Sequence, residues 1–293
     1  YLPIMCDEAV VIRNGLRDLM KNKFVNIAGY KFIEILDKTN LQLKFREFCF
    51  NHELLGTILL SNEGINFFLS GQNENINSFL EFLDSDERFK SIPIKKSFSE
   101  KCTFRKMNVR LKKEIISMGK DDINPSINTG EKISPKEFRH WLEEKKDIII
   151  LDTRNDYEIR LGSFENSENL NLSTFRGFPE AISLSSLDRE KTVVMYCTGG
   201  IRCEKASAEM LNQGFKDVRQ LDGGILGYFE SVGGDYWNGD CFVFDRRVAV
   251  DSELNETNIE VCYACREPLN LDELSSKKYV IGESCPYCYD NEN

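Results

Sequence analysis

The sequence is poor in histidine, with only His52 and His140 among its 293 residues. So few imidazoles exclude histidine-rich metal sites and leave little room for a Ser-His-Asp or Cys-His relay. Both histidines lie in segments predicted to be helical, and we expect structural roles for them. No stretch approaches the roughly 20 apolar residues of a membrane-spanning helix, so we expect no membrane association. The N-terminus lacks the pattern of an export signal, which predicts a cytoplasmic protein with reduced thiols.

Positive charge is also scarce, since 38 Lys and Arg residues stand against 48 Asp and Glu residues, a net charge of −10. A surface that binds polyanions must therefore be local. The segment 88–113 is such an exception, because its only acidic residue is Glu100. A solvated edge strand is one interpretation, since lysines also protect exposed sheet edges. The other is a basic strip that binds an RNA backbone through Lys95, Lys96, Lys101, Arg105, Lys106, Arg110, Lys112 and Lys113.

Residues 23–118 are predicted to form an α+β domain. Segments rich in β-forming residues alternate with segments of helical periodicity in the order β-α-β-β-α-β, which is the order of the ferredoxin-like fold. Residues 1–22 lack a periodic pattern and are expected to be an N-terminal extension. The polar segment 119–132, interrupted by Gly and Pro, is expected to be a linker.

Residues 133–235 are predicted to form an α/β domain. Ser134-Pro135-Lys136-Glu137 is a capping box with proline at the first helical position. Short apolar runs at 147–151 and 192–196 have the character of strands that are covered on both faces. Because these runs alternate with helical segments, we expect a mostly parallel sheet.

The segment Tyr196-Cys197-Thr198-Gly199-Gly200-Ile201-Arg202-Cys203 carries the most specific chemical signal. Cys197 directly follows a buried strand, and a glycine-containing loop then enters a helix, which places the sulfur at the carboxyl end of the sheet. Loop amides and a helix N-terminus favour an anion and lower the pKa of a thiol. A buried structural cysteine is the alternative. We predict instead a catalytic Cys197 thiolate assisted by Arg202, with Thr198, Gly199, Gly200, Ile201 and Cys203 completing the active-site loop.

Several neighbouring residues have two interpretations. Asp152 and Arg154 are expected to support the site: Asp152 fixes the strand end, and Arg154 either orients a substrate phosphate or supports the loop. Cys203 either resolves an oxidised Cys197 or packs at the start of the helix, and we favour packing. The segment 236–255 connects to the C-terminus. In it Trp237, Phe242 and Phe244 alternate like a buried strand, with a base-stacking platform as the alternative.

The C-terminal segment 256–293 carries two cysteine pairs, Cys262-x2-Cys265 and Cys285-x2-Cys288, with 19 residues between them. This spacing predicts a tetrahedral zinc site of four thiolates, and the alternative is two unligated pairs. The segment is too small and polar to bury a core of its own, so metal binding would supply its folding energy. Four protein ligands leave no open position, which predicts a structural zinc.

The Cys197 loop resembles that of the rhodanese superfamily, and the resemblance covers residues 134–234. It extends to the Asp152-Thr153-Arg154 strand end and to the turn Leu221-Asp222-Gly223-Gly224. Gly162-Ser163 departs from the Gly-His of many members. Four residues separate Cys197 from Arg202, which matches the compact loop of the sulfurtransferases rather than the longer loop of the related phosphatases.

Two flanking motifs, Asn62-Glu63-Gly64-Ile65-Asn66 and Cys241-Phe242-Val243-Phe244-Asp245, narrow the resemblance. The chain is identified as a member of the rhodanese-containing tRNA uridine 5-hydroxylases. This implies an oxygen-dependent conversion of the wobble uridine, position 34, to 5-hydroxyuridine, with O2 as co-substrate and an electron donor that the sequence does not reveal. It implies the tRNA anticodon stem-loop as partner, rather than DNA, and Cys197 as the catalytic cysteine and persulfide carrier. A rhodanese-type persulfide sulfurtransferase is the alternative.

Overall fold

The computed structural model describes residues 24–289, so the predicted N-terminal extension lies outside the described residues. The chain divides into two units. The first comprises most of residues 24–111. The second comprises residues 112–289 together with two short segments, 32–36 and 61–65.

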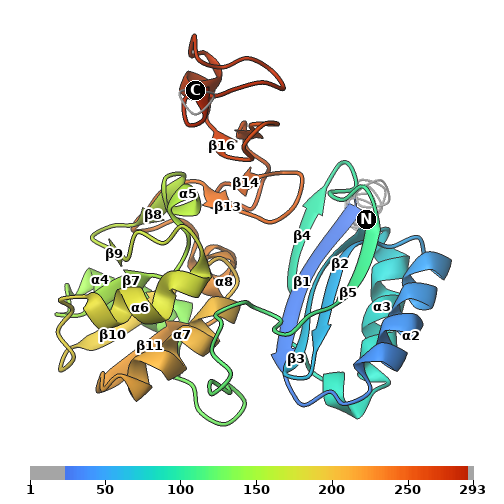
Figure 1. Cartoon of the computed structure of the whole chain (residues 1–293), viewed down its shortest axis with the longest axis horizontal. Coiled ribbons are helices and arrows are strands. Elements are labelled where there is room, and N and C mark those ends of the chain that lie inside the picture. Colours follow the sequence, from blue (N-terminus) through green and yellow to red (C-terminus); the bar gives the residue numbers. More distant parts are fainter. Residues whose placement is uncertain (1–23, 290–293) are drawn as a thin grey trace, which may run out of the picture. The chain divides into compact units, whose positions relative to one another are not determined.

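The first unit is an α+β domain with a five-stranded sheet of order β4-β1-β3-β2-β5. The predicted order β-α-β-β-α-β is confirmed, and helices α2 and α3 cover one face of the sheet (Figure 1). They do so because each helix has one apolar face, with Phe45 of α2 and Phe79 of α3 both buried. The elements are β1 (Phe24–Phe32), α2 (Lys38–Asn51), β2 (Leu55–Ser61), β3 (Gly64–Gly71), α3 (Asn73–Asp84), the 3-10 helix η1 (Glu87–Phe89), β4 (Lys95–Ser99) and β5 (Met107–Leu111).

The strand β5 was not predicted, and it lies at the sheet edge opposite β4. It pairs in parallel with β2, whereas β4 pairs antiparallel with β1. The chain between β4 and β5 contacts a polar face of the sheet, where the Thr103 hydroxyl donates to Asn26 Oδ1 at 2.9 Å and the Asn26 amide donates to Ser99 Oγ at 2.9 Å. These hydrogen bonds satisfy the buried polar groups of Asn26 and Thr103 where the connection passes the sheet.

The second unit contains a parallel sheet of order β6-β11-β10-β7-β9, as the sequence predicted. The central strand β10 has Val193, Val194, Met195 and Tyr196 all inaccessible to solvent, because helices cover both of its faces. The strands are β6 (Glu131–Ile133), β7 (Ile149–Asp152), β9 (Glu168–Asn169), β10 (Thr192–Tyr196) and β11 (Asp217–Leu221).

Two apolar cores hold the helices against this sheet. On one face Phe138 of α4 and Tyr228 of α8 pack with Val194 and Tyr196 of β10. On the other face Phe178 of α6 and Met210 of α7 pack with Met195. The helices are α4 (Pro135–Glu143), the short α5 (Asp156–Ile159), α6 (Phe178–Leu184) after the 3-10 helix η2 (Phe175–Gly177), α7 (Ile201–Asn212) and α8 (Gly224–Val232).

The segment expected to be a linker, 119–132, lies against α7. Ile123 belongs to the core on that side, and the Gly130 amide donates to Ser207 Oγ at 2.8 Å. Just before it, Glu114 accepts from the buried Lys205 ammonium at 2.8 Å. These contacts explain why α7 is buried on nearly all sides.

Short antiparallel pairs follow the parallel sheet: β8 (Gly162–Phe164) with β12 (Trp237–Gly239), β13 (Cys241–Phe242) with β14 (Ala249–Val250), and β15 (Glu260–Val261) with β16 (Pro268–Leu269), before α9 (Leu271–Leu274). The expectation that Trp237, Phe242 and Phe244 alternate on one buried strand is wrong. Cys241 and Val243, which are an even number of residues from the buried Trp237, enter the core instead, and Phe244 is 46% exposed.

Within residues 24–289, no helix has the length and hydropathy that crossing a bilayer requires.

Candidate active site and metal centre

Cys197 directly follows β10, at the carboxyl end of the parallel sheet, and α7 begins four residues later. Its side chain is buried, with 1% of the residue exposed. The Gly200 amide donates to Cys197 Sγ at 3.1 Å, and Gly200 adopts a left-handed conformation with φ of 99°. Glycine tolerates this φ without a steric penalty, which lets the loop close around the sulfur.

The surroundings of Cys197 favour its ionised form. Burial by itself would raise the pKa of this thiol. A hydrogen bond from Cys203, the charge of Arg202 and the backbone amides of Arg202 and Gly200 outweigh burial and lower the pKa to about 6. At neutral pH the sulfur is therefore mainly a thiolate, the nucleophilic form of cysteine.

Arg202 lies on the first turn of α7 and forms a buried, bidentate ion pair with Glu158 of α5. The Arg202 Nη1–Glu158 Oε2 and Nη2–Oε1 distances are 2.5 and 2.8 Å. Burial would raise the pKa of Glu158, but the adjacent guanidinium lowers it. No local pattern in the sequence connects Glu158 with Arg202, because 44 positions separate them along the chain.

Asp152 and Arg154 lie at the end of β7, and both side chains are fully buried. The Arg154 guanidinium donates to both carboxylate oxygens of Asp152, and its Nη2 also donates to the Gly162 carbonyl at 2.6 Å. Arg154 is thus enclosed at the end of the strand, where its guanidinium links Asp152 to Gly162.

Cys203 is buried beneath the loop, on α7. Its sulfur lies 3.7 Å from Thr153 Oγ1, and Thr153 in turn donates to the Tyr196 carbonyl at 2.9 Å. Burial and the hydrogen bond to Cys197 raise the pKa of Cys203 well above its ordinary value. The two cysteines of the loop therefore differ in charge, with Cys203 a neutral donor to an anionic Cys197.

The turn Leu221-Asp222-Gly223-Gly224 packs against the backbone of the Cys197 loop. The amides of Ile225 and Leu226, at the start of α8, donate to the carbonyls of Cys197 and Thr198 at 3.0 and 3.1 Å. Gly224 has a φ of +62°, and a Cβ added there would lie 2.3 Å from the Cys197 carbonyl oxygen. Only glycine allows this close approach, whereas a Cβ on Gly199 would meet no atom within 4 Å.

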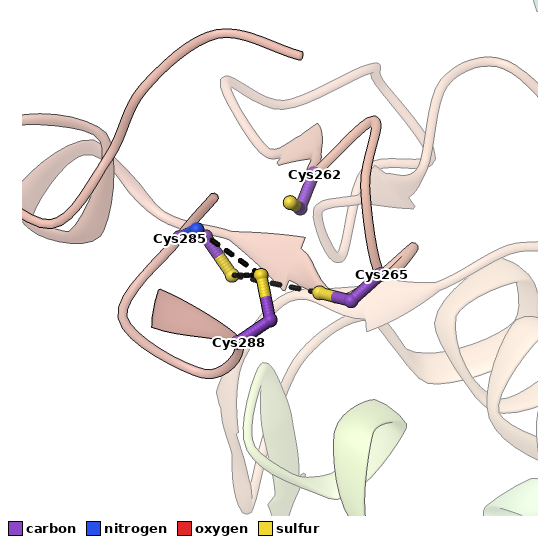
Figure 2. Close-up of side chains that lie close together, drawn as sticks. All are labelled: Cys262, Cys265, Cys285 and Cys288. Atoms are coloured by element: carbon purple, nitrogen blue, oxygen red, sulfur yellow. Dashed lines mark hydrogen bonds between the residues drawn. The ribbon is translucent and has the colours of Figure 1, made fainter. Parts of the chain in front are cut away.

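The four C-terminal cysteines converge on one point, two from each pair (Figure 2). Their sulfurs all lie within 4.8 Å of one another, with Cys265–Cys285 and Cys285–Cys288 separations of 3.5 and 3.7 Å. A tetrahedral zinc with Zn–S bonds of about 2.3 Å has sulfurs about 3.8 Å apart. The cluster therefore fits a metal ion of that size and ligand preference.

The four-cysteine segment contacts the rest of the second unit through Arg160, the residue that follows α5. Its guanidinium pairs with Glu267 at 2.5 Å, and its Cζ lies 3.9 Å from the centroid of the Tyr287 ring. Both partners lie beside the cysteine pairs in the sequence.

The basic residues predicted to bind RNA lie on several different elements. Lys95 and Lys96 lie on β4, at one edge of the N-terminal sheet, and Arg110 lies on β5, at the opposite edge. Lys101, Arg105 and Lys106 are exposed in the connection between these strands. Lys112 and Lys113 belong to the second unit, where Lys113 pairs with Asp121 at 2.8 Å. This separation depends on β5, a strand that the sequence did not predict.

Comparison with known proteins identifies the family. The chain is 44% identical over 272 residues to a tRNA uridine(34) hydroxylase of Cupriavidus pinatubonensis, covering 91% of this chain and 96% of that protein. A tRNA uridine(34) hydroxylase of Acaryochloris marina is also 44% identical, with 92% and 87% covered. The chain belongs to the tRNA uridine(34) hydroxylase family. The resemblance drawn from the Cys197 loop and its flanking motifs is thereby confirmed.

Domain families match the two folds of this tRNA uridine(34) hydroxylase family member. The family described as UPF0176 acylphosphatase like domain matches residues 24–115, and the Rhodanese-like domain family matches residues 134–231. Among solved structures, a rhodanese-like domain from Anabaena sp. is 20% identical, with a TM-score of 0.32, and covers 38% of this chain and 80% of that one.

Proposed function

We propose that this protein hydroxylates C5 of uridine 34 in tRNA, using O2 as co-substrate and Cys197 as the catalytic nucleophile. The observation that carries the proposal is the buried Cys197 thiolate, held by the Gly200 amide and with its pKa lowered to about 6, in a chain that matches tRNA uridine(34) hydroxylases over most of its length. A tRNA substrate is consistent with a cytoplasmic enzyme.

The reaction begins when the Cys197 thiolate adds to C6 of the uracil ring. A C–S bond forms, and the C5–C6 π electrons move toward C5 and the O4 carbonyl, giving an enolate. This enolate attacks O2 through C5, and protonation of the product gives a C5 hydroperoxide. A two-electron donor of the thiol class, with two protons, reduces the hydroperoxide to the alcohol and releases water. Loss of the C5 proton then breaks the C6–S bond and restores the thiolate with 5-hydroxyuridine.

The residues around Cys197 have distinct roles in this scheme. The Gly200 amide and Cys203 hold the anionic sulfur before it attacks and when it leaves. Arg202 supplies positive charge beside the sulfur, and Glu158 fixes the position of the guanidinium. The Gly224 turn keeps the loop closed around the sulfur.

The C-terminal cysteines Cys262, Cys265, Cys285 and Cys288 would hold a structural zinc ion. Their sulfur separations support this assignment, and four protein ligands leave no position for substrate. The ion would stabilise a segment whose buried apolar residues are few, mainly Cys262, Leu269 and Cys285.

The anticodon stem-loop would bind through exposed basic residues of the N-terminal unit. Lys96 and Arg110 lie at opposite edges of the sheet, so the two residues would contact different phosphates or only one of them would contact the RNA. Lys96→Ala and Arg110→Ala separate the two edges. A variant that removes a phosphate contact should weaken the salt dependence, so that the magnitude of the slope of log affinity against log salt falls by about 1. Unchanged slopes in both variants would reject this surface.

The direct test uses purified protein, unmodified tRNA, a dithiol reductant and 18O2. We expect mass spectrometry of the digested tRNA to find 5-hydroxyuridine at position 34 with one 18O atom. Unlabelled product, or none, would reject the proposal. The compact loop also fits a persulfide sulfurtransferase, and a protein that transfers sulfur from thiosulfate to cyanide without hydroxylating tRNA would support that alternative.

A further inference from the structure

Phe244 is an exposed aromatic residue at the edge of the proposed active site. With 46% of the residue exposed, its ring is in contact with water, although Cys241 and Val243 on either side of Phe242 are buried. Covering an aromatic ring of this size with another apolar surface is energetically favourable. The ring is therefore a candidate contact for a bound aromatic group.

The backbone connects Phe244 to the catalytic loop. Thr198, the residue after Cys197, donates its hydroxyl to the Phe242 carbonyl at 3.4 Å. The guanidinium carbon of Arg202 lies 5.7 Å from the centroid of the Phe244 ring. The ring therefore lies beside Arg202, and the segment that carries it is tied to the loop through Phe242 and Thr198. The loop itself faces open space at Gly199.

Neighbouring groups hold the Phe244 ring in a defined orientation. Phe242 contacts it edge to face, with centroids 5.2 Å apart and an interplanar angle of 82°, and Tyr157 of α5 contacts Phe242 in the same way at 5.2 Å. Beyond the ring, Asp245 accepts from the Arg247 amide and guanidinium at 3.0 Å each. The same turn holds Val248 at a φ of +62°, a conformation that a β-branched residue rarely adopts. Strain of this kind is found where the surrounding structure fixes a functional segment.

We propose that Phe244 is a substrate-positioning residue, whose ring stacks on the uracil of uridine 34 and holds C6 next to Cys197. This proposal rests on the proposed function. A nucleobase is the occupant that fits, because a flat aromatic surface, rather than an unpaired charge, borders the loop: Arg202 is already paired with Glu158. Stacking recognises the base by its π face, which suits a base splayed out of an anticodon loop.

The kinetic test compares Phe244→Leu with Phe244→Tyr and with Phe50→Leu, an exposed phenylalanine on α2. Stacking of one base is worth ~1–3 kcal/mol, so we expect Phe244→Leu to lower kcat/KM for tRNA by about 5- to 150-fold. Phe244→Tyr should restore activity to within about twofold of the wild type, because it keeps the aromatic face. Phe50→Leu should also stay within about twofold, because Phe50 belongs to the first unit and not to the unit that carries the Cys197 loop. A Phe244→Leu variant as active as Phe50→Leu would overturn the proposal, as would a loss of activity accompanied by a changed Cys197 pKa.

The binding test uses Phe244→Trp, which is informative even if Phe244→Leu folds poorly. We expect an anticodon stem-loop RNA with uridine 34 to quench the added fluorescence, measured as the difference from the wild type. The same RNA with an abasic site at position 34 should not quench it, whereas an abasic site at position 33 should. Equal quenching by all three would overturn the proposal. A wild-type protein that forms no 5-hydroxyuridine would instead reject the proposed function itself.

Discussion

The two cysteine centres of this protein use the same side chain in opposite ways. Cys197 is buried beneath its loop, where an amide at 3.1 Å and the charge of Arg202 stabilise a single thiolate. In the C-terminal segment, four sulfurs lie within 4.8 Å of one another and Cys265 is exposed. Four thiolates this close repel one another unless a cation lies between them. The neighbours of a cysteine, rather than its sequence motif alone, decide whether it is a nucleophile or a ligand.

The scaffolds of the two centres differ in the same way. The Cys197 loop is anchored between β10, in the centre of a sheet covered on both faces, and the first turn of α8. The cysteine cluster is anchored by the short hairpin β15–β16, the helix α9 and a small apolar cluster. The Cys197 site is therefore held in place by the surrounding sheet and helices, whereas the four-cysteine segment would be stabilised by the metal that it binds.

The largest expected effect is the loss of chemistry in Cys197→Ser. Without the thiolate, no adduct forms at C6, and we expect 5-hydroxyuridine to fall below detection by mass spectrometry while bound zinc is retained. Cys102→Ser, which changes a half-buried cysteine of the N-terminal unit, is the matched control and should keep full activity. Product formation by Cys197→Ser would show that the sulfur is dispensable.

Cys285→Ser changes the four-cysteine cluster and leaves the Cys197 site intact. Structural zinc contributes ~10–16 kcal/mol to the folding of such segments, so we expect loss of the bound ion and of amide exchange protection in residues 260–289. Elemental analysis and hydrogen exchange measure both. The pKa of Cys197 should not change. Retention of zinc at full stoichiometry, or unchanged protection, would contradict a structural four-thiolate site.

Glu158→Gln tests the buried ion pair that accompanies the catalytic loop. Removing one partner of a buried pair costs ~3–5 kcal/mol of unfolding free energy, measured by urea denaturation at pH 7. Because the folded-state pKa of Glu158 is lowered from 4.5, its contribution is complete above pH 4.5 and diminishes as the pH falls through the folded value. The advantage of the wild type over Glu158→Gln should shrink accordingly in acid.

The exposed pair Arg139–Glu143 on α4 provides the control for this comparison. Glu143→Gln should cost less than ~1 kcal/mol, because water screens an exposed pair. Equal costs at Glu158 and Glu143 would mean that burial adds nothing to the Arg202 interaction.

Two glycines of the site should respond differently to an added methyl group. Gly224→Ala forces a positive φ and a contact with the Cys197 carbonyl, so we expect a loss of ~1–3 kcal/mol in stability together with reduced hydroxylation. Gly199→Ala finds open space and should change the unfolding free energy by less than ~1 kcal/mol. Thermal melts of both variants measure the difference. A stable, fully active Gly224→Ala protein would show that the turn does not support the loop.

Local signals in the sequence were sufficient for much of the fold. The order of strands and helices in the N-terminal domain, the parallel sheet and the grouping of the four cysteines all follow from periodicity or spacing within short segments. The Cys197 loop could be predicted because the strand, the glycines and the helix follow one another directly in the sequence.

Features that depend on contacts between residues far apart in the sequence could not be predicted from it. Glu158 meets Arg202 only through the fold, and β5 pairs with β2 across a long separation, which places Lys96 and Arg110 at opposite sheet edges. Phe244 shows a different failure. Phe242 and Phe244 are an odd number of residues from Trp237, so alternation from the buried Trp237 places Cys241 and Val243 toward the core and Phe244 away from it, as the structure has them.

The most direct test of the account is the ionisation of Cys197. The thiolate absorbance of the wild type minus that of Cys197→Ser, followed against pH, isolates this sulfur without requiring access by a reagent. We expect the difference to rise with an inflection near pH 6, and to shift upward in Cys203→Ala, because that variant removes a donor to the thiolate. An inflection near pH 9, the value of an ordinary thiol, would contradict the account of Cys197 as a thiolate held for nucleophilic attack.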